Sequence, residues 1–144
     1  MPRPDPHLLD PARYPFDTEV DVRFSDMDVN RHINNVSLSN FVEEGRVRFH
    51  RASGYISAIS GIGSMVASVG IEYVGQAFYP GTLHLHAGAS HLGRTSYTLD
   101  LLITQDNRPV VFARSVMVCT KEGKPHPIPD SFREAATGAW SVRA

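Results

Sequence analysis

The sequence predicts an α+β domain in which an antiparallel sheet covers one long helix. Three observations support this prediction. Apolar and polar residues alternate over residues 18–24, which is typical of a half-buried strand. Apolar residues then recur at spacings of three and four over residues 36–52, which is typical of an amphipathic helix. Four strand-like segments joined by short turns follow, and this order of elements favours an α+β fold.

Residues 1–17 come before the first strand and are rich in proline, which lacks a backbone N–H group. We therefore expect an extended N-terminal arm here and a single domain over residues 18–144. In the first strand, Val20, Val22 and Phe24 alternate with charged residues, so one face of the strand is expected to be buried.

The long helix is expected to start at Val36 and to run for about 16 residues. Gly54 stands where glycine commonly ends a helix. A continuous apolar stripe must lie against another element, which here is the sheet. The predicted stripe consists of Leu38, Phe41, Val42, Gly45, Phe49 and Ala52.

The later part of the chain is expected to form the rest of the sheet. Glycine, proline and asparagine separate its apolar segments, and these residues are typical of hairpins and turns. Residues 131–140 are predicted to form a short closing helix. The four strands are predicted at residues 64–74, 82–92, 96–105 and 110–120.

Length and composition limit the classes of function. A chain of 144 residues, 42% hydrophobic and 20% charged, has the balance of a soluble globular domain. Its net charge of −1 gives no electrostatic reason to expect nucleic acid or an anionic membrane as a partner. No apolar run approaches the roughly 20 residues of a membrane span, and the N-terminus lacks the apolar core of a secretory signal. Since Cys119 is the single cysteine, we expect a cytoplasmic protein without an internal disulfide.

A polar segment between the first strand and the helix, RFSDMDVNRHINN, is the candidate site. Asp28, Asn30 and His32 alternate along it, so an extended chain would project their side chains to one side. A carboxylate can act as a base or nucleophile, while an amide and an imidazole can orient a substrate. The N–H groups at the helix start can polarise a carbonyl. From composition alone, capping and turn formation is the more common role of such residues, and Asp26 could simply bind loop amides.

The longer stretch RFSDMDVNRHINNVSLSNFVEEGR combines an Asp-x-Asp, a short loop, a His-x-Asn-Asn element and a helix glutamate followed by arginine. It resembles the signature segment of the hotdog-fold thioesterases in the 4-hydroxybenzoyl-CoA thioesterase-like branch. The part DMDVNRHINN is especially similar to the fatty acyl-ACP thioesterases of plants. The resemblance implies a hotdog fold over about residues 18–129, with about five antiparallel strands wrapped around one central helix. It also implies hydrolysis of an acyl thioester.

The resemblance assigns roles to individual residues of the segment. Asp28 matches the catalytic aspartate, which acts as a nucleophile or as a base toward water. Asn30 and His32 match residues that assist this carboxylate and position the thioester. The backbone N–H groups around Asn34 and Asn35 fall where many relatives bind the thioester carbonyl.

Gln76 and Arg94 are further implied as substrate-binding residues, and the sequence departs from the family pattern at Gln76 and Arg31. Gln76 stands where the plant enzymes have a glutamate, and an amide cannot accept a proton as a carboxylate can. Arg94 lies in a turn that touches the phosphates of coenzyme A in some relatives, although an exposed turn residue explains it as well. Arg31 replaces a glycine of most bacterial relatives, so either the backbone differs there or a cation reaches toward the ligand.

The expected function is that of an acyl-CoA thioesterase that needs no cofactor, since coenzyme A is part of the substrate. An acyl-ACP thioesterase, a hotdog hydratase and a non-catalytic acyl-thioester binding protein are the alternatives. His84, His86 and His91 could form part of a metal site, but no further cluster has zinc spacing, so we expect no metal. Because a single sheet exposes an edge, we expect a homodimer, or the homotetramer that is common in the family.

Overall fold

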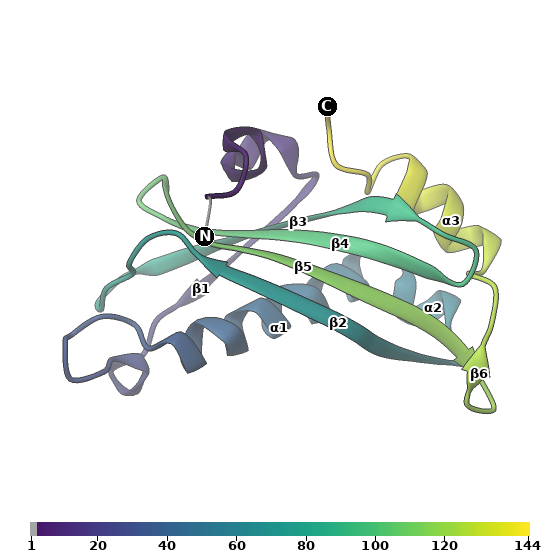
Figure 1. Ribbon diagram of the computed structural model, residues 1–144, viewed down its shortest axis with the longest axis horizontal. Helices are drawn as coiled ribbons and strands as arrows, with labels where there is room; N and C mark the ends of the chain where they lie inside the picture. The colour runs from purple at the N-terminus through teal and green to yellow at the C-terminus, as the bar shows by residue number, and fades with distance from the viewer. Residues whose placement is uncertain (1–2) are drawn as a thin grey trace.

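The computed structural model describes residues 3–144. An antiparallel sheet curls around the long helix α1, in the strand order β1-β3-β4-β5-β2 with β6 paired to β5, and this confirms the predicted hotdog fold (Figure 1). None of the helices formed by the described residues is long and apolar enough to cross a bilayer. The elements are η1 (Pro6–Leu9), η2 (Pro11–Arg13), β1 (Phe16–Asp21), η3 (Phe24–Asp26), α1 (Asn35–Ala52), α2 (Tyr55–Ala58), β2 (Gly63–Tyr73), β3 (Thr82–Leu92), β4 (Ser96–Gln105), β5 (Arg108–Lys121), β6 (Lys124–Pro125) and α3 (Asp130–Thr137).

Local signals set both ends of α1. The side chain of Asn34 caps the start, because its Oδ1 accepts a hydrogen bond from the N–H group of Val36 at 2.8 Å. At the other end, Gly54 has φ = 84°, a left-handed conformation that glycine adopts easily after a helix, as predicted. The helix therefore starts one residue before the predicted position and is 18 residues long.

The apolar stripe of α1 is confirmed from Leu38 to Phe49 and wrong at its last member. Ala52 is exposed, whereas the neighbouring His50 is buried beside Tyr97, to which its ring is hydrogen-bonded. The helix comes very close to the sheet at Gly45, where an added Cβ would lie 2.6 Å from Cδ1 of Leu101. Glycine at this position therefore allows the sheet to wrap tightly around α1.

The predicted strands agree with the structure to within two residues, except for the first. That strand was expected at residues 18–24 but is Phe16–Asp21, because the next residues turn away into η3. The carboxylate of Asp26 accepts a hydrogen bond from the N–H group of Arg23 at 2.8 Å, which stabilises this turn. The closing helix was predicted at residues 131–140 and is Asp130–Thr137.

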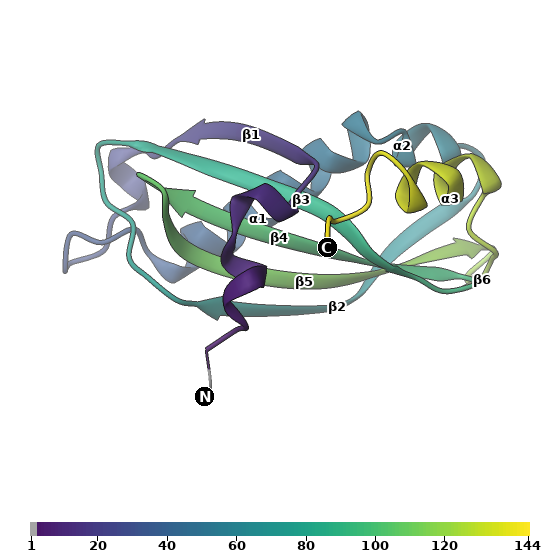
Figure 2. The ribbon, with the colours of Figure 1, turned by 90° about the horizontal axis from the view of Figure 1, so that it is seen from above.

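The N-terminal arm is not extended over residues 6–13, in contrast to the prediction. It forms η1 and η2, because Asp5 and Asp10 cap these short helices and a proline follows each of them. The arm crosses the outer face of the sheet, on the side opposite α1 (Figures 1 and 2). The end of the chain also reaches the arm, since Nη1 of Arg143 donates to the carbonyl of Ala12 at 2.9 Å.

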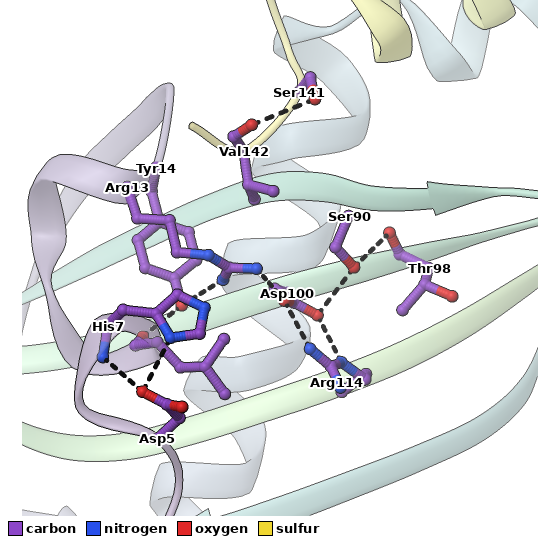
Figure 3. A network of polar contacts seen from close by, with 11 residues as sticks. Asp5, His7, Arg13, Tyr14, Ser90, Thr98, Asp100, Arg114, Ser141 and Val142 are labelled. Carbon is purple, nitrogen blue, oxygen red and sulfur yellow. Dashed lines mark hydrogen bonds and ion pairs between the residues drawn. The ribbon is translucent and has the colours of Figure 1, made fainter. Parts of the chain in front are cut away.

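A buried carboxylate fixes the arm to the sheet. Asp100 is 0% exposed and points to the outer face, because its neighbours in β4 point toward α1. Arg13 of the arm donates to its Oδ2 at 2.9 Å, and Arg114 of β5 donates to both oxygens at 2.7 and 2.9 Å. Ser90 of β3 donates to Oδ1 at 3.0 Å (Figure 3). One side chain thus links the arm to three strands.

Candidate active site

Residues 27–33 fold back on themselves between η3 and α1. The N–H group of Asp28 donates to the carbonyl of His32 at 2.9 Å, and the N–H group of Arg31 donates to the carbonyl of Asp28 at 3.0 Å. Met27 and Ile33 form an isolated antiparallel bridge. Residues 28–31 therefore form a turn, in which Arg31 has φ = 64°, so the extended chain that would project Asp28, Asn30 and His32 to one side is not present.

The turn orients the carboxylate of Asp28. Its Oδ1 accepts hydrogen bonds from the N–H groups of Asn30 at 2.8 Å and of His32 at 3.4 Å. The turn-forming role that composition favours is thus confirmed for this oxygen. No hydrogen bond within residues 3–144 involves Oδ2. The side chain is half-buried, so it has one fixed oxygen and one oxygen that a ligand can reach.

Asp28 lies in a surface pocket with a volume of about 470 Å³. The aromatic rings of Phe24 and Tyr79 meet edge to face in its wall, with centroids 5.8 Å apart. Asn30 is exposed and does not line the pocket, and the ring of His32 packs against Phe78 instead, at 5.5 Å. The pocket is lined by Phe24, Met27, Asp28, Val29, Arg31 and Tyr79.

The start of α1 supplies N–H groups close to this turn. The N–H group of Asn34 donates to the carbonyl of Asp26 at 2.8 Å, and that of Val36 is taken by the Asn34 side chain. Among the described residues, no acceptor is bonded to the N–H groups of Asn35 and Ser37. Of the two predicted carbonyl-binding positions, Asn35 therefore has the available donor.

Asp26 has a structural role in this segment. It is 1% exposed, and Nη2 of Arg23 donates to its Oδ1 at 2.9 Å. Burial alone would raise the pKa of Asp26, but the hydrogen bonds from Arg23 and the charge of Arg23 hold it below the ordinary value. Asp26 thus remains ionised and anchors the loop, as the turn-forming alternative expects.

The connection between β2 and β3 brings Gln76 to the site. The N–H group of Ile33 donates to the carbonyl of Ala77 at 2.8 Å, so residues 74–81 run beside the segment that leads into α1. Buried Gln105 holds this connection, because its side chain accepts from the N–H group of Phe78 and donates to the Phe78 carbonyl, both at 2.9 Å. Gln76 is exposed and directly precedes Ala77, whose partner Ile33 directly precedes Asn34.

Arg94 is not near Asp28 within one chain. It lies in the β3–β4 turn, at the opposite end of the sheet from the loop that carries Asp28 (Figure 1). The intervening strand β3 has 11 residues and spans roughly 35 Å at about 3.3 Å per residue. The spacing of Asp28 and Arg94 along the sequence does not reveal how far apart they lie in the fold.

Tyr73 was not predicted as part of the site. Its hydroxyl lies 2.9 Å from Oγ of Ser39 and donates to the carbonyl of Asn35 at 3.4 Å, so the end of β2 touches the first turn of α1. The aromatic wall of the pocket was missed as well. Aromatic residues cluster around the β2–β3 connection in the sequence, and this cluster was the signal for Tyr73 and for the pocket wall. Where these residues lie in the fold depends on tertiary pairing.

The histidines of β3 take part in packing and polar contacts. The rings of His84 and His86 stack with centroids 6.3 Å apart, and Nε2 of His86 lies 3.0 Å from Oγ1 of Thr104. Burial lowers the pKa of His86. His91 is exposed. Within residues 3–144, no three His, Cys, Asp or Glu side chains are grouped so that they could hold a metal ion.

The chain is similar to several known proteins. It is 30% identical over 89 residues to the uncharacterized protein YsmA of Bacillus subtilis, and the match covers 62% of this chain and 60% of that relative. A predicted thioesterase from Bacillus stearothermophilus has a similar structure, with a TM-score of 0.78 and 26% identity over 90% of this chain and 98% of that one. A thioesterase from Thermus thermophilus, solved in complex with coenzyme A and Zn, gives a TM-score of 0.77 and 25% identity over 88% and 95% of the two chains.

The family model of the thioesterase-like superfamily matches residues 22–136. This range includes the turn of Asp28, the whole of α1 and every strand of the sheet except β1. The fold agrees with that of solved proteins at lower identity, such as PA5185 of Pseudomonas aeruginosa, with a TM-score of 0.79, 22% identity and coverage of 92% and 95% of the two chains. The chain therefore belongs to the thioesterase-like superfamily and has the hotdog fold.

Proposed function

We propose that the protein hydrolyses acyl-CoA thioesters to a free acid and coenzyme A, with Asp28 as nucleophile or general base. The observation that carries this proposal is the geometry of the Asp28 carboxylate in its pocket. Two backbone N–H groups fix Oδ1, and Oδ2 has no hydrogen-bond partner among the described residues. A carboxylate that is held in place and still accessible suits attack on a carbonyl or activation of water.

Both versions of the reaction balance without a further reagent. As a nucleophile, Asp28 attacks the thioester carbon, the thiolate leaves, and water then hydrolyses the acyl-aspartate anhydride. As a base, Asp28 takes a proton from water while the water oxygen attacks the same carbon. In each case the thiolate takes up a proton and the acid is released.

The negative charge that forms on the carbonyl oxygen needs nearby donors. The N–H groups of Asn35 and Ser37 lie in the first turn of α1, where the helix dipole also favours negative charge. In this scheme Asn30 and His32 support the turn that positions Asp28, and Gln76 flanks the thioester. No metal or added cofactor takes part in the proposed step.

Coenzyme A is the carrier we favour. The similar thioesterase from Thermus thermophilus, described as bound to coenzyme A, supports this choice. The similarity of residues 26–35 to plant acyl-ACP thioesterases keeps an acyl carrier protein as the alternative. Affinity for an acidic carrier protein would fall steeply with added salt, so the two carriers can be separated experimentally.

We also propose that the protein works as a homodimer joined along β2. Within residues 3–144, β2 pairs only with β5, and residues 65–70 of this strand are exposed. Met65, Val66 and Val69 are 55%, 37% and 44% exposed, and β2 has no charged residue before Glu72. A sheet edge that carries no charged side chains is suited to pairing with a second strand.

The opposite edge of the sheet differs in chemistry. In β1, Asp17, Glu19 and Asp21 alternate along the exposed side, which disfavours pairing with another copy. Antiparallel pairing of two β2 strands would bring the β3–β4 turn of one copy toward the Asp28 end of the other. In that arrangement Arg94 could bind coenzyme A at the active site of the other copy.

Thiol release from acyl-CoAs of different chain lengths tests the activity. Asp28→Asn keeps an oxygen that can accept the N–H groups of Asn30 and His32, and it should lower kcat/KM roughly 100- to 10,000-fold. Asp106→Asn, in the exposed β4–β5 turn, is the control and should keep full activity. Undiminished hydrolysis by Asp28→Asn would contradict the catalytic role. Binding of thioesters by the native protein without release of thiol from CoA or ACP would identify a binding protein instead.

A further inference from the structure

We propose that Arg31 makes this thioesterase selective for acyl groups that carry a second carboxylate. The inference rests on the proposed function and goes beyond it by naming the substrate class. It concerns the pocket of Asp28, where Arg31 supplies a positively charged group.

The backbone at Arg31 does not favour an arginine. Its φ of 64° lies in the left-handed region, which glycine adopts without strain and which is unfavourable for a residue with a long side chain. Glycine would close the turn equally well, since the hydrogen bond to the carbonyl of Asp28 uses only the N–H group. A strained residue at a candidate site suggests a role for its side chain.

The side chain of Arg31 is also available to a ligand. Arg13, Arg23, Arg48 and Arg114 each lie within 4.0 Å of a carboxylate and donate hydrogen bonds to it. Within residues 3–144, no ion pair or side-chain hydrogen bond involves the guanidinium of Arg31. A guanidinium group is a cation and can bind a carboxylate with two parallel hydrogen bonds.

The position of Arg31 relative to Asp28 indicates which part of the substrate it meets. The two residues are the ends of one β-turn, whose Cα atoms lie within about 7 Å of each other. Both line the same pocket, so a thioester carbonyl at Asp28 would have its acyl group within reach of the guanidinium. The phosphates of coenzyme A are separated from its sulfur by the pantetheine chain, roughly 15 Å when extended. Arg31 is therefore better placed for the acyl end than for the phosphates.

The rest of the pocket suits the remainder of such an acyl group. Phe24, Met27, Val29 and Tyr79 provide apolar surface between and around the two charged residues. Short methylene chains can lie against this surface while a terminal carboxylate meets Arg31. A negatively charged acyl group would also compensate the positive charge of Arg31, which otherwise faces water.

The experiment compares two thioesters of equal size, glutaryl-CoA and 5-methylhexanoyl-CoA, in which an isopropyl group replaces the carboxylate. The native protein should have the higher kcat/KM for glutaryl-CoA. Arg31→Gly, which relaxes the backbone at φ = 64°, should lower kcat/KM for glutaryl-CoA roughly 10- to 100-fold more than for the uncharged ester. Arg31→Lys should keep part of the preference, and Arg51→Ala, exposed in the last turn of α1, should keep all of it.

The same acyl groups on N-acetylcysteamine, which has no phosphates, identify the source of the anion. Loss of the glutaryl preference on both carriers supports the proposal. A loss that is equal for both acyl groups and restricted to coenzyme A esters would place Arg31 at the phosphates and overturn it. Hydrolysis with no preference in the native protein overturns the inference alone, whereas no hydrolysis of any thioester overturns the proposed function and the inference with it.

Discussion

The guanidinium of Arg13 and the carboxylate of Asp100 form an ion pair with an N–O distance of 2.9 Å, although they are 87 residues apart in sequence. The Arg13 side chain is only 10% exposed, and that of Asp100 is 0% exposed. The arm is thus attached to the sheet by a buried carboxylate, whose charge would be poorly solvated without its arginine partners. The attachment of the arm therefore depends on keeping this carboxylate ionised and paired.

Asp100→Asn should destabilise the protein by about 3–5 kcal/mol, because it breaks a buried ion pair and leaves Arg13 without its partner. Urea unfolding, followed by far-UV circular dichroism, measures this loss. Asp106→Asn, at an exposed turn, should change the free energy of unfolding by less than about 0.5 kcal/mol. Equal stability of the two variants would show that the pairing of Asp100 contributes little.

The contribution of Asp100 should also depend on pH. Burial alone would raise the pKa of Asp100, but the hydrogen bonds from Arg114 and Arg13 hold it below the ordinary value. A carboxylate with a lowered pKa stabilises the folded state above its unfolded pKa of about 3.9, and this stabilisation is lost as the pH falls through the folded value. The difference in stability between the native protein and Asp100→Asn should therefore shrink below pH 4. A constant difference from pH 7 to pH 3 would contradict this.

His50 should cause a second loss of stability at a higher pH. Burial lowers the pKa of His50 to about 3, and the charge of Arg46 acts in the same direction. The unfolded chain takes up a proton near pH 6.5 while the folded state does not, so stability should fall by about 1.4 kcal/mol per pH unit below pH 6.5. His50→Gln, which cannot titrate, should remove this part of the slope. Unfolding curves between pH 7 and pH 5 measure it, and identical slopes would refute the buried neutral histidine.

Gln105→Leu should loosen the β2–β3 connection beside the site. It removes the two hydrogen bonds to the backbone of Phe78, which lies next to Tyr79 in the pocket wall. We expect a loss of about 1–3 kcal/mol in stability and faster hydrogen exchange at the N–H group of Phe78. Gln105→Glu keeps an acceptor for that N–H group but buries an unpaired carboxylate facing the Phe78 carbonyl, so it should lose at least as much stability. Unchanged exchange in Gln105→Leu would mean that other contacts hold the connection.

Val66→Lys should separate the proposed dimer. It places a charge in the exposed apolar edge of β2, where pairing with a second copy would bury it. Native mass spectrometry should show dimers for the native chain and monomers for this variant. Ser131→Lys, exposed on α3, is the control and should remain dimeric. A native chain that is monomeric at micromolar concentration would contradict the dimer.

The fold was largely predictable because its elements carry regular local signals. The spacing of apolar residues from Leu38 to Phe49 identified α1, and Gly54 identified its end. Burial of His50 in place of Ala52 was not predictable, since it depends on Tyr97, which comes from a strand far along the chain. In the same way, spacing within the sequence does not reveal that Arg13 and Arg114 both pair with Asp100 in the structure.

The candidate site was predictable in position and only partly in geometry. Asp28, Asn30 and His32 would project to one side only in an extended chain, but hydrogen bonds from backbone N–H groups to the Asp28 side chain stabilise a turn instead. The spacing of these polar residues is the same whether the segment is extended or forms a turn, so the spacing alone cannot distinguish the two conformations. The pocket wall at Tyr79 arises from pairing between distant segments, which spacing within one segment cannot reveal.

The strand order has a consequence for how the chain folds. β3, β4 and β5 follow one another through short turns, so their pairing closes only small loops. β1 pairs with β3 through contacts such as Phe16 with Ala87, and β2 pairs with β5 from Gly63 opposite Thr120. Closing these longer loops costs more entropy, so we expect the two edge strands to join a meander that is already formed. The edge that carries the proposed dimer contact would then become available for association only late in folding.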